Sequence, residues 1–248
     1  MEHLNSLIAV LIMIAAYYFG GRFVNSKSAD RKILVSVAAG ISVAYIFVSL
    51  LPELSDAQEF YNNNKNEKAF ELQNILIYLT ALAGFLFFFG LENYIISKRD
   101  AEHEENQKHF NINMVTGVYL TGFLINNFLI SYLIVFWGNS NTALFFYTIA
   151  MSVHLVALDY SAIREFGEGF KHIKFSMVFS LIAGWLVGIS TKFPEEIEHI
   201  ATGFIAGSII INSIKDEFPK EGSNVKYKVF LISSVIYAVI LILSHDFT

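Results

Sequence analysis

The sequence predicts an all-α integral membrane protein: an eight-helix transmembrane bundle with both termini outside. Hydrophobic residues make up 54% of the 248 and charged residues only 16%, whereas a soluble domain is about a quarter charged. Mean hydropathy is +0.51. The charges are confined to short stretches between apolar runs of about 20 residues, the length that spans a bilayer. Little chain remains for anything else, so we expect a single polytopic membrane domain over 1–248.

Long apolar runs with charged borders predict spans at residues 4–24, 32–54, 74–97, 112–137, 142–163, 173–190, 197–214 and 227–244. The first is expected to be a helix of the mature chain, because Glu2 and His3 replace the basic start of a signal peptide and Tyr17–Tyr18 replace small cleavage-site residues. The fifth carries His154 and Asp159, so a re-entrant or bundle-buried segment is an alternative there.

The basic residues fix the orientation. With eight spans, one side receives Arg22, Lys27, Arg31, Lys32, Lys98, Arg99, Lys108, Arg164, Lys171, Lys174, Lys215, Lys220, Lys226 and Lys228, and the other receives Lys65, Lys68 and Lys192. The positive-inside rule then places both termini outside. The outer stretch 55–73 is expected to be a solvated loop, with or without a short surface helix. No soluble-type repeat is visible.

Several function classes are disfavoured. The chain has no cysteine, which excludes disulfides, thiolate metal sites and cysteine nucleophiles. A net charge of −5 gives no reason to expect nucleic acid as a partner. We expect no enzyme, because EExxxR, HExxH and GxSxG patterns are missing. The expected location is a multi-pass position in the plasma membrane, or in the inner membrane of a prokaryote, with the lipid bilayer as partner.

Polar groups at membrane depth are the natural candidates for function, because a charge at the centre of a span costs about 2.5 to 3.5 kcal/mol. The candidates for a metal or substrate path are His154, Asn127, Asn126, Asp159 and Glu92. His154 is the strongest, since it lies close to mid-membrane, where an imidazole can bind a metal or a hydrogen-bond partner such as Asn126 or Asn127. Asp159 lies about 140° further around the helix, nearer the inner boundary, where water or Arg164 could compensate it.

The two asparagines are adjacent and point about 100° apart, so at most one is expected to face the bundle centre squarely. Hydrogen bonding between helices is the simpler role for them. In the inner stretch 98–111, His103 and His109 accompany Glu102, Glu104 and Glu105. Such a cluster could capture a divalent cation loosely, although an ordinary hydrophilic loop explains it as well.

Small residues and prolines add two expectations. GWLVG (184–188) and GFIAG (203–207) each place two glycines on one helix face, which allows close backbone approach. Packing within one bundle is the default, and a homodimer is the alternative. Pro52, Pro194 and Pro219 are all expected at helix ends, with none inside a span.

Three stretches carry a family resemblance. AAGISVAYIFVSLLPE (38–53), FSLIAGWLVGI (179–189) and IATGFIAGSIIINSIKDEFPKE (200–221) are similar to the second, sixth and seventh spans of the ZIP (Zrt/Irt-like) divalent-metal transporters. Eight spans, outside termini and a histidine-containing inner loop after the third span also resemble that family. The resemblance implies transport of a divalent cation such as zinc, iron or manganese, as substrate and not as resident cofactor.

The family's ligand motifs are only partly matched. Its HNxxD pattern falls on NNFLI, where Asn126 stands for His, Asn127 for Asn and Ile130 for Asp. Its HExPH pattern falls on HLVAL, where only His154 matches and Leu158 takes the last ligand position.

The resemblance therefore implies an atypical transporter that moves by an elevator or rocking motion around His154 and Asn127. The alternative is a non-transporting ZIP-like receptor, scaffold or partner subunit. A weaker hypothesis is an inner-side cation site of Glu92, Asp159, Asp216 and Glu217.

Overall fold

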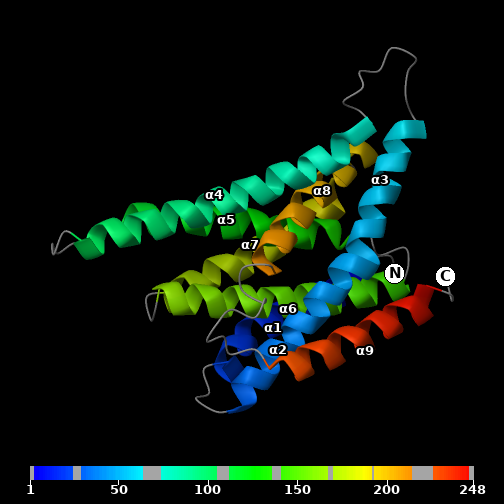
Figure 1. Ribbon diagram of the computed structural model, residues 1–248. Helices are drawn as coiled ribbons and strands as arrows, with labels where there is room; N and C mark the ends of the chain where they lie inside the picture. Colours follow the sequence, from blue (N-terminus) through cyan, green and yellow to red (C-terminus); the bar gives the residue numbers. More distant parts are fainter. Residues whose placement is uncertain are drawn as a thin grey trace.

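The computed structural model describes residues 3–24, 29–63, 74–104, 112–135, 141–166, 170–191, 193–213 and 226–245. The helices are α1 (Leu4–Val24), α2 (Ala29–Tyr45), α3 (Leu51–Asn63), α4 (Leu76–Glu104), α5 (Ile112–Leu133), α6 (Asn141–Phe166), α7 (Phe170–Ser190), α8 (Glu195–Asn212) and α9 (Tyr227–His245), with a π-helical turn η1 (Ile46–Leu50) between α2 and α3. No strand occurs in these ranges, which confirms the all-α class. Both termini lie at one end of the molecule, which we call the terminal face (Figure 1).

Each predicted span falls on a helix, but two helices extend further than expected. Helix α4 runs on to Glu104, so residues 98–104, expected as loop, are helical. This extension is rich in Lys, Arg, Ala and Glu, which are strong helix formers. The side chain of His103 and all of His109 lie outside the described residues. The cation site predicted for this loop therefore stays a prediction.

Helix α3 differs from two of the expectations. Helix α3 continues without a break to Asn63, through the first part of the stretch 55–73, which was expected to be a solvated loop with or without a short surface helix. It continues because Leu54, Ala57 and Gln58 are buried, and the Gln58 side-chain oxygen accepts a 3.0 Å hydrogen bond from the backbone N–H of Ile77 at the start of α4.

Pro52 lies inside this rod and not at a helix end. A proline has no N–H to donate to the carbonyl four residues back. The chain widens into η1 just before it, where the N–H of Leu51 bonds to the carbonyl of Ile46. The π-helical turn therefore lets α2, η1 and α3 continue as one helix across Pro52.

Four helix pairs make most of the contacts: α1 with α6, α5 with α7, α2 with α9, and α4 with α8. The members of each pair run in the same direction. In α5 and α7, for example, Ser180 meets the carbonyl of Leu124 and Gly184 meets that of Phe128, one turn further along both helices. Pairs of this kind join helices that are distant in sequence.

Glycines allow the closest of these approaches. A Cβ atom on Gly184 would overlap the carbonyl of Phe128, and one on Gly207 would overlap that of Ala81. Gly203 lies against Thr80 and the carbonyl of Ile77, and Gly40 lies against α9. Both glycine motifs therefore pack inside the bundle, as the default interpretation predicted.

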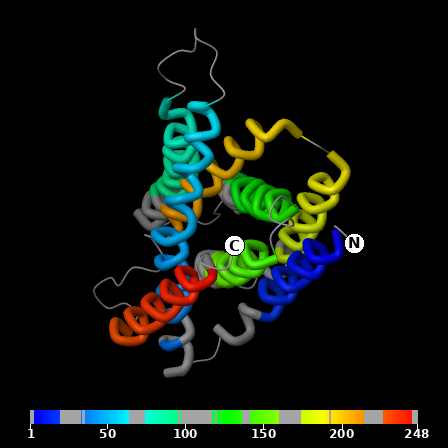
Figure 2. Tube along the Cα trace, turned by 90° about the vertical axis from the view of Figure 1, so that its right-hand side faces the viewer, coloured from blue at the N-terminus to red at the C-terminus, as the bar shows by residue number. Residues whose placement is uncertain are grey.

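The pairs form two halves, which face each other in Figure 2. The site half consists of α1, α5, α6 and α7, and the flanking half consists of α2 with α3, α4, α8 and α9. The four helix pairs are related to one another by an exchange of helices. If α1 is exchanged with α7, α5 with α6, α2 with α8, and α4 with α9, each of the four pairs becomes another of the four. Each exchange also replaces a helix by one that runs the opposite way, which is the pattern of an inverted repeat.

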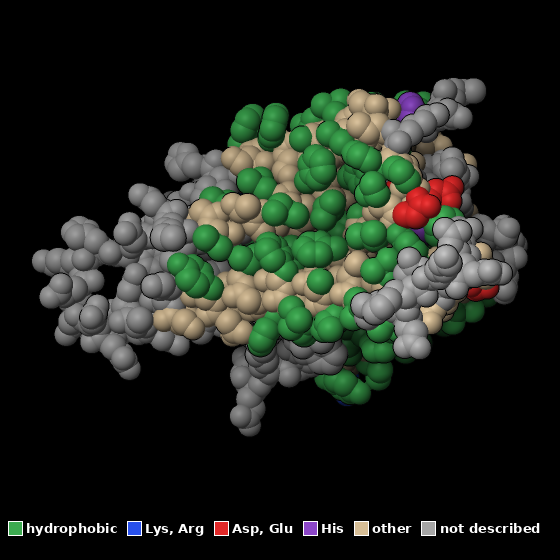
Figure 3. Space-filling view, turned by 90° about the horizontal axis from the view of Figure 1, so that it is seen from above, with side chains coloured by type: hydrophobic (Ala, Val, Ile, Leu, Met, Phe, Trp, Pro, Cys, Tyr) green, Lys and Arg blue, Asp and Glu red, His purple; other side chains and the backbone are tan. Residues whose placement is uncertain are grey.

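Apolar side chains cover much of the described surface on the face seen in Figure 3. Within the described residues, four helical segments are long and apolar enough to cross a membrane: Ser36–Asn63, Leu76–Tyr94, Asn141–Asp159 and Tyr227–Ser244. Leu4–Phe19, Leu120–Leu133 and Lys174–Ser190 are shorter apolar helices. The acidic side chains seen together in Figure 3 lie at one end of the molecule.

Candidate functional site

Asn126 joins the two halves. Its side chain is 1% exposed, and its Oδ1 accepts a short hydrogen bond from the hydroxyl of Ser208 on α8. Its Nδ2 has no hydrogen-bond partner in the part of the chain that the structure describes. A buried donor left unpaired is expensive, so this interface between α5 and α8 carries a polar group that the protein itself satisfies only in part.

Asn127 points to a different neighbour. Its Nδ2 donates to the sulfur of Met177 on α7 at 3.6 Å, while its buried Oδ1 finds no partner among the described residues. The adjacent asparagines diverge as predicted. Both are nevertheless buried, because α5 has α8 on one side and α7 on the other.

His154 is buried on α6, with 2% of its surface exposed. It shares a helix face with Tyr147, whose hydroxyl donates a 2.9 Å hydrogen bond to the carbonyl of Ile130 on α5. The Nε2 of His154 has no hydrogen-bond partner in the described ranges. The alternative of a histidine bonded to Asn126 or Asn127 is therefore not what the structure has.

Asp159 is fully buried and lies in an ion pair. The ammonium of Lys174 on α7 donates a 2.7 Å hydrogen bond to its Oδ2. Lys174, at the start of α7, is thus the cation that compensates it, while the side chain of Arg164 lies outside the described residues. Asp159 faces α7 and α1, so it does not share the surroundings of His154, as their angular separation predicted.

The remaining candidates are not joined to these. Glu92 is half-buried on α4, in the flanking half, and Asp216 and Glu217 lie outside the described residues. No group of three or more His, Asp or Glu side chains that could hold a metal ion occurs in the described ranges.

The unmatched motif positions are part of the hydrophobic core. Ile130, Leu155 and Leu158 are each exposed by no more than 2% and pack in one cluster. An aliphatic side chain there adds packing and supplies no ligand, so the arrangement offers imidazole nitrogen, amide oxygen and thioether sulfur and lacks carboxylates. Zinc is usually held by His, Cys and carboxylate groups.

Sequence reasoning missed Ser208, Met177 and Lys174 as partners. Lys174 had a signal, because a lysine at the start of one span can reach a carboxylate near the end of the preceding one. Met177 and Ser208 had none, since contacts between helices distant in sequence decide them.

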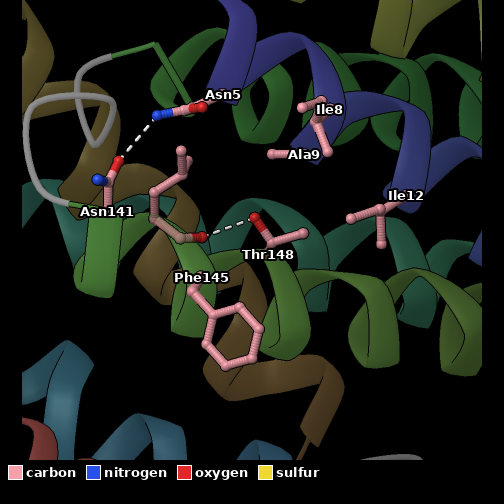
Figure 4. Close-up of a pocket in the computed structure, with 8 residues that line it drawn as sticks. Asn5, Ile8, Ala9, Ile12, Asn141, Phe145 and Thr148 are labelled. Atoms are coloured by element: carbon pink, nitrogen blue, oxygen red, sulfur yellow. Dashed lines mark hydrogen bonds between the residues drawn. The ribbon is translucent and has the colours of Figure 1, made fainter.

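A groove of about 300 Å³ opens between α1 and α6 near the terminal face. Figure 4 shows Asn5 and Asn141 meeting across it through a 2.8 Å hydrogen bond, with Ile8, Ile12 and Phe145 along its length. It contains none of the candidate site residues.

No family model and no curated protein sequence matches the chain. The ZIP resemblance therefore stays a prediction from the quoted stretches and the predicted spans.

Proposed function

We propose that this protein is a ZIP-like transporter with eight membrane spans and both termini outside, and that it moves a divalent metal cation. The lengths of the helices outside the four long apolar segments support eight spans, because α1, α5, α7 and α8 contain 21, 22, 21 and 18 residues. At about 1.5 Å per residue, each is close to the thickness of a bilayer core.

The charge distribution supports the orientation. At the terminal face, α3 carries the exposed Asp56 and Glu59, and α8 begins with Glu195, Glu196 and Glu198. The described lysines Lys174, Lys226 and Lys228 lie at the opposite end. An acidic outer face and a basic inner face are what the positive-inside rule expects.

One observation carries the transport proposal: partly satisfied polar groups lie in the middle of an inverted arrangement of helices. Inverted repeats place substrate sites of secondary transporters near mid-membrane, between the repeats. Asn126, Asn127 and His154 lie on α5 and α6, the two central helices of this arrangement, and each has an unpaired polar atom. The Asn127 Oδ1 and the His154 Nε2 carry lone pairs and would gain a partner when a cation enters, whereas the unpaired atom of Asn126 is an amide nitrogen, which donates and does not bind a cation.

The proposed movement is a displacement of the site half against the flanking half. The bond between Asn126 and Ser208 crosses this boundary and would break as the halves move. Ile130, Leu155 and Leu158 fill unmatched positions of the family's motifs and carry no ligand atom, so we expect weak binding of the cation and rapid release.

Metal flux into proteoliposomes tests the proposal. An entrapped chelating dye would report entry of Zn²⁺, Mn²⁺ or Fe²⁺ by the wild type, and His154→Ala is expected to lower the initial rate by at least about tenfold. His3→Ala is the matched control, because His3 is exposed at the terminal face. Equal rates for His154→Ala and wild type would refute the site, and no flux in the wild type would refute transport.

A non-transporting receptor, scaffold or partner subunit is the second candidate. The buried Ile130 and Leu158 favour it, because they fill positions where the resembled family places ligands. Restoring a carboxylate and an imidazole in the Ile130→Asp/Leu158→His double variant separates the two functions. Flux gained only in this double variant would favour the scaffold for the natural chain.

A further inference from the structure

Three other side chains, which we call the pocket, lie close to the Lys174 ammonium: Asp159 and Tyr17 are buried, and Tyr18 is about half exposed. It contacts Oδ2 of Asp159 at 2.7 Å, and it lies 5.2 Å from the ring centre of Tyr17 and 5.9 Å from that of Tyr18. Helices α1 and α6 supply the pocket, and α7 supplies the ammonium. Both ring distances are within the range of cation–π attraction.

The Asp159 carboxylate can accept more than its hydrogen bond from Lys174. Asp159 is 0% exposed, yet its second oxygen, Oδ1, has no hydrogen-bond partner within the described ranges. Carboxylate oxygens that are buried need a donor or a cation. Lys174 satisfies only one of the two.

The charge of the pocket selects its occupant. One carboxylate balances one positive charge, and a dication would leave an uncompensated charge in a buried place. Aromatic faces attract weakly hydrated cations such as ammonium groups. The chemistry therefore fits a small monovalent cation and disfavours strongly hydrated Mg²⁺.

We propose that Asp159, Tyr17 and Tyr18 form a binding site for one monovalent cation of the size of ammonium or potassium, which Lys174 occupies in this structure. The site is distinct from the proposed divalent-cation path at Asn127 and His154. Lys174 can leave it without leaving the protein, because it lies near the beginning of α7 and its side chain is 15% exposed. Its long aliphatic part lets the ammonium reach the membrane boundary.

Thermal unfolding of the purified full chain in detergent tests this site. Lys174→Gln removes the built-in cation, and the Asp159→Asn/Lys174→Gln double variant removes the carboxylate as well. Each is titrated with KCl or NH₄Cl against N-methylglucamine chloride at constant ionic strength, with MgCl₂ as a further comparison. Binding to the folded state raises the unfolding midpoint.

We expect a saturable rise for Lys174→Gln in K⁺ or NH₄⁺ and none for the double variant. Wild type should need a concentration higher by at least about tenfold, since Lys174 competes. An equal rise in the double variant, a larger response to Mg²⁺ than to K⁺, or no response of Lys174→Gln would overturn the proposal. Failure of Lys174→Gln to fold in every salt would overturn it too. The assay measures binding alone, so its outcome does not depend on metal flux.

Discussion

The two halves of the molecule differ in how much of their helix surface is buried and in which side chains lie in their interior. In the flanking half, two helices expose much of their surface: the apolar windows of α4 and α9 are only 22% and 11% buried, although that of α2 with α3 is 44% buried. In the site half, the window of α6 is 50% buried, and the interior holds amides, an imidazole and a carboxylate. Among the described residues, the unpaired polar atoms of Asn126, Asn127, His154 and Asp159 belong to this half, and that of Ser213 lies at the end of α8 in the flanking half.

This difference indicates that the two halves have different roles. Close apolar packing stabilises a helix pair whatever the protein does. Buried polar atoms without partners lower stability. The half that contains several of them therefore has polar groups whose role is not to stabilise the fold. Three substitutions would break or sharpen the comparison, each with a control from the same chain.

The largest effect is expected at the ion pair. Asp159→Asn would leave the Lys174 ammonium beside a neutral amide in a buried place, and should lower the free energy of unfolding by about 3 to 5 kcal/mol. Equilibrium unfolding in mixed micelles with dodecyl sulfate measures it. Asp159→Leu/Lys174→Met removes both charges and should lose much less. If the double variant is as unstable as the single one, the pair is not what holds α6 to α7.

An intermediate effect is expected in the flanking half. A methyl group at Gly84 would overlap the backbone carbonyl of Phe204 on α8, whereas one at Gly90 on the same helix meets nothing within 4 Å. Gly84→Ala should therefore destabilise by about 1 to 3 kcal/mol. Gly90→Ala should stabilise by about 0.5 to 1 kcal/mol, because alanine favours helix. Equal effects of the two would show that α4 and α8 do not pack this closely.

The sequence predicted the helices well, because apolar length and charged borders are local properties. It placed the end of α3 wrongly, since the burial of Gln58 and its bond to Ile77 depend on α4. It also placed Pro52 at a helix end, because a proline after an apolar run usually marks one. A π-helical turn is a less common outcome.

For the candidate site, the sequence identified buried polar residues and their angular separation on a helix. It could not identify their partners. Met177 and Ser208 reach the asparagines from α7 and α8, helices far along the chain, and the four parallel helix pairs follow no simple chain order. The inverted arrangement is likewise a property of contacts and leaves no visible repeat in the residues.

The smallest effect tests the comparison inside the site half itself. Ser180 and Ser152 are both buried, but the Ser180 hydroxyl donates a 2.5 Å hydrogen bond to the carbonyl of Leu124, whereas that of Ser152 has no partner among the described residues. Ser180→Ala should cost about 1 kcal/mol, and Ser152→Ala should be neutral or stabilising, because it removes a hydroxyl whose desolvation is not repaid.

Both substitutions delete the same atom, so side-chain volume and helix propensity change equally and the difference between them isolates the hydrogen bond. Equal losses, measured in the same mixed micelles, would mean that the Ser152 hydroxyl is paired in the protein and that the site half is as well satisfied as the flanking half. A stabilising Ser152→Ala that also slows metal flux would instead link an unpaired polar atom of α6 to function, because stability and activity would then change in opposite directions.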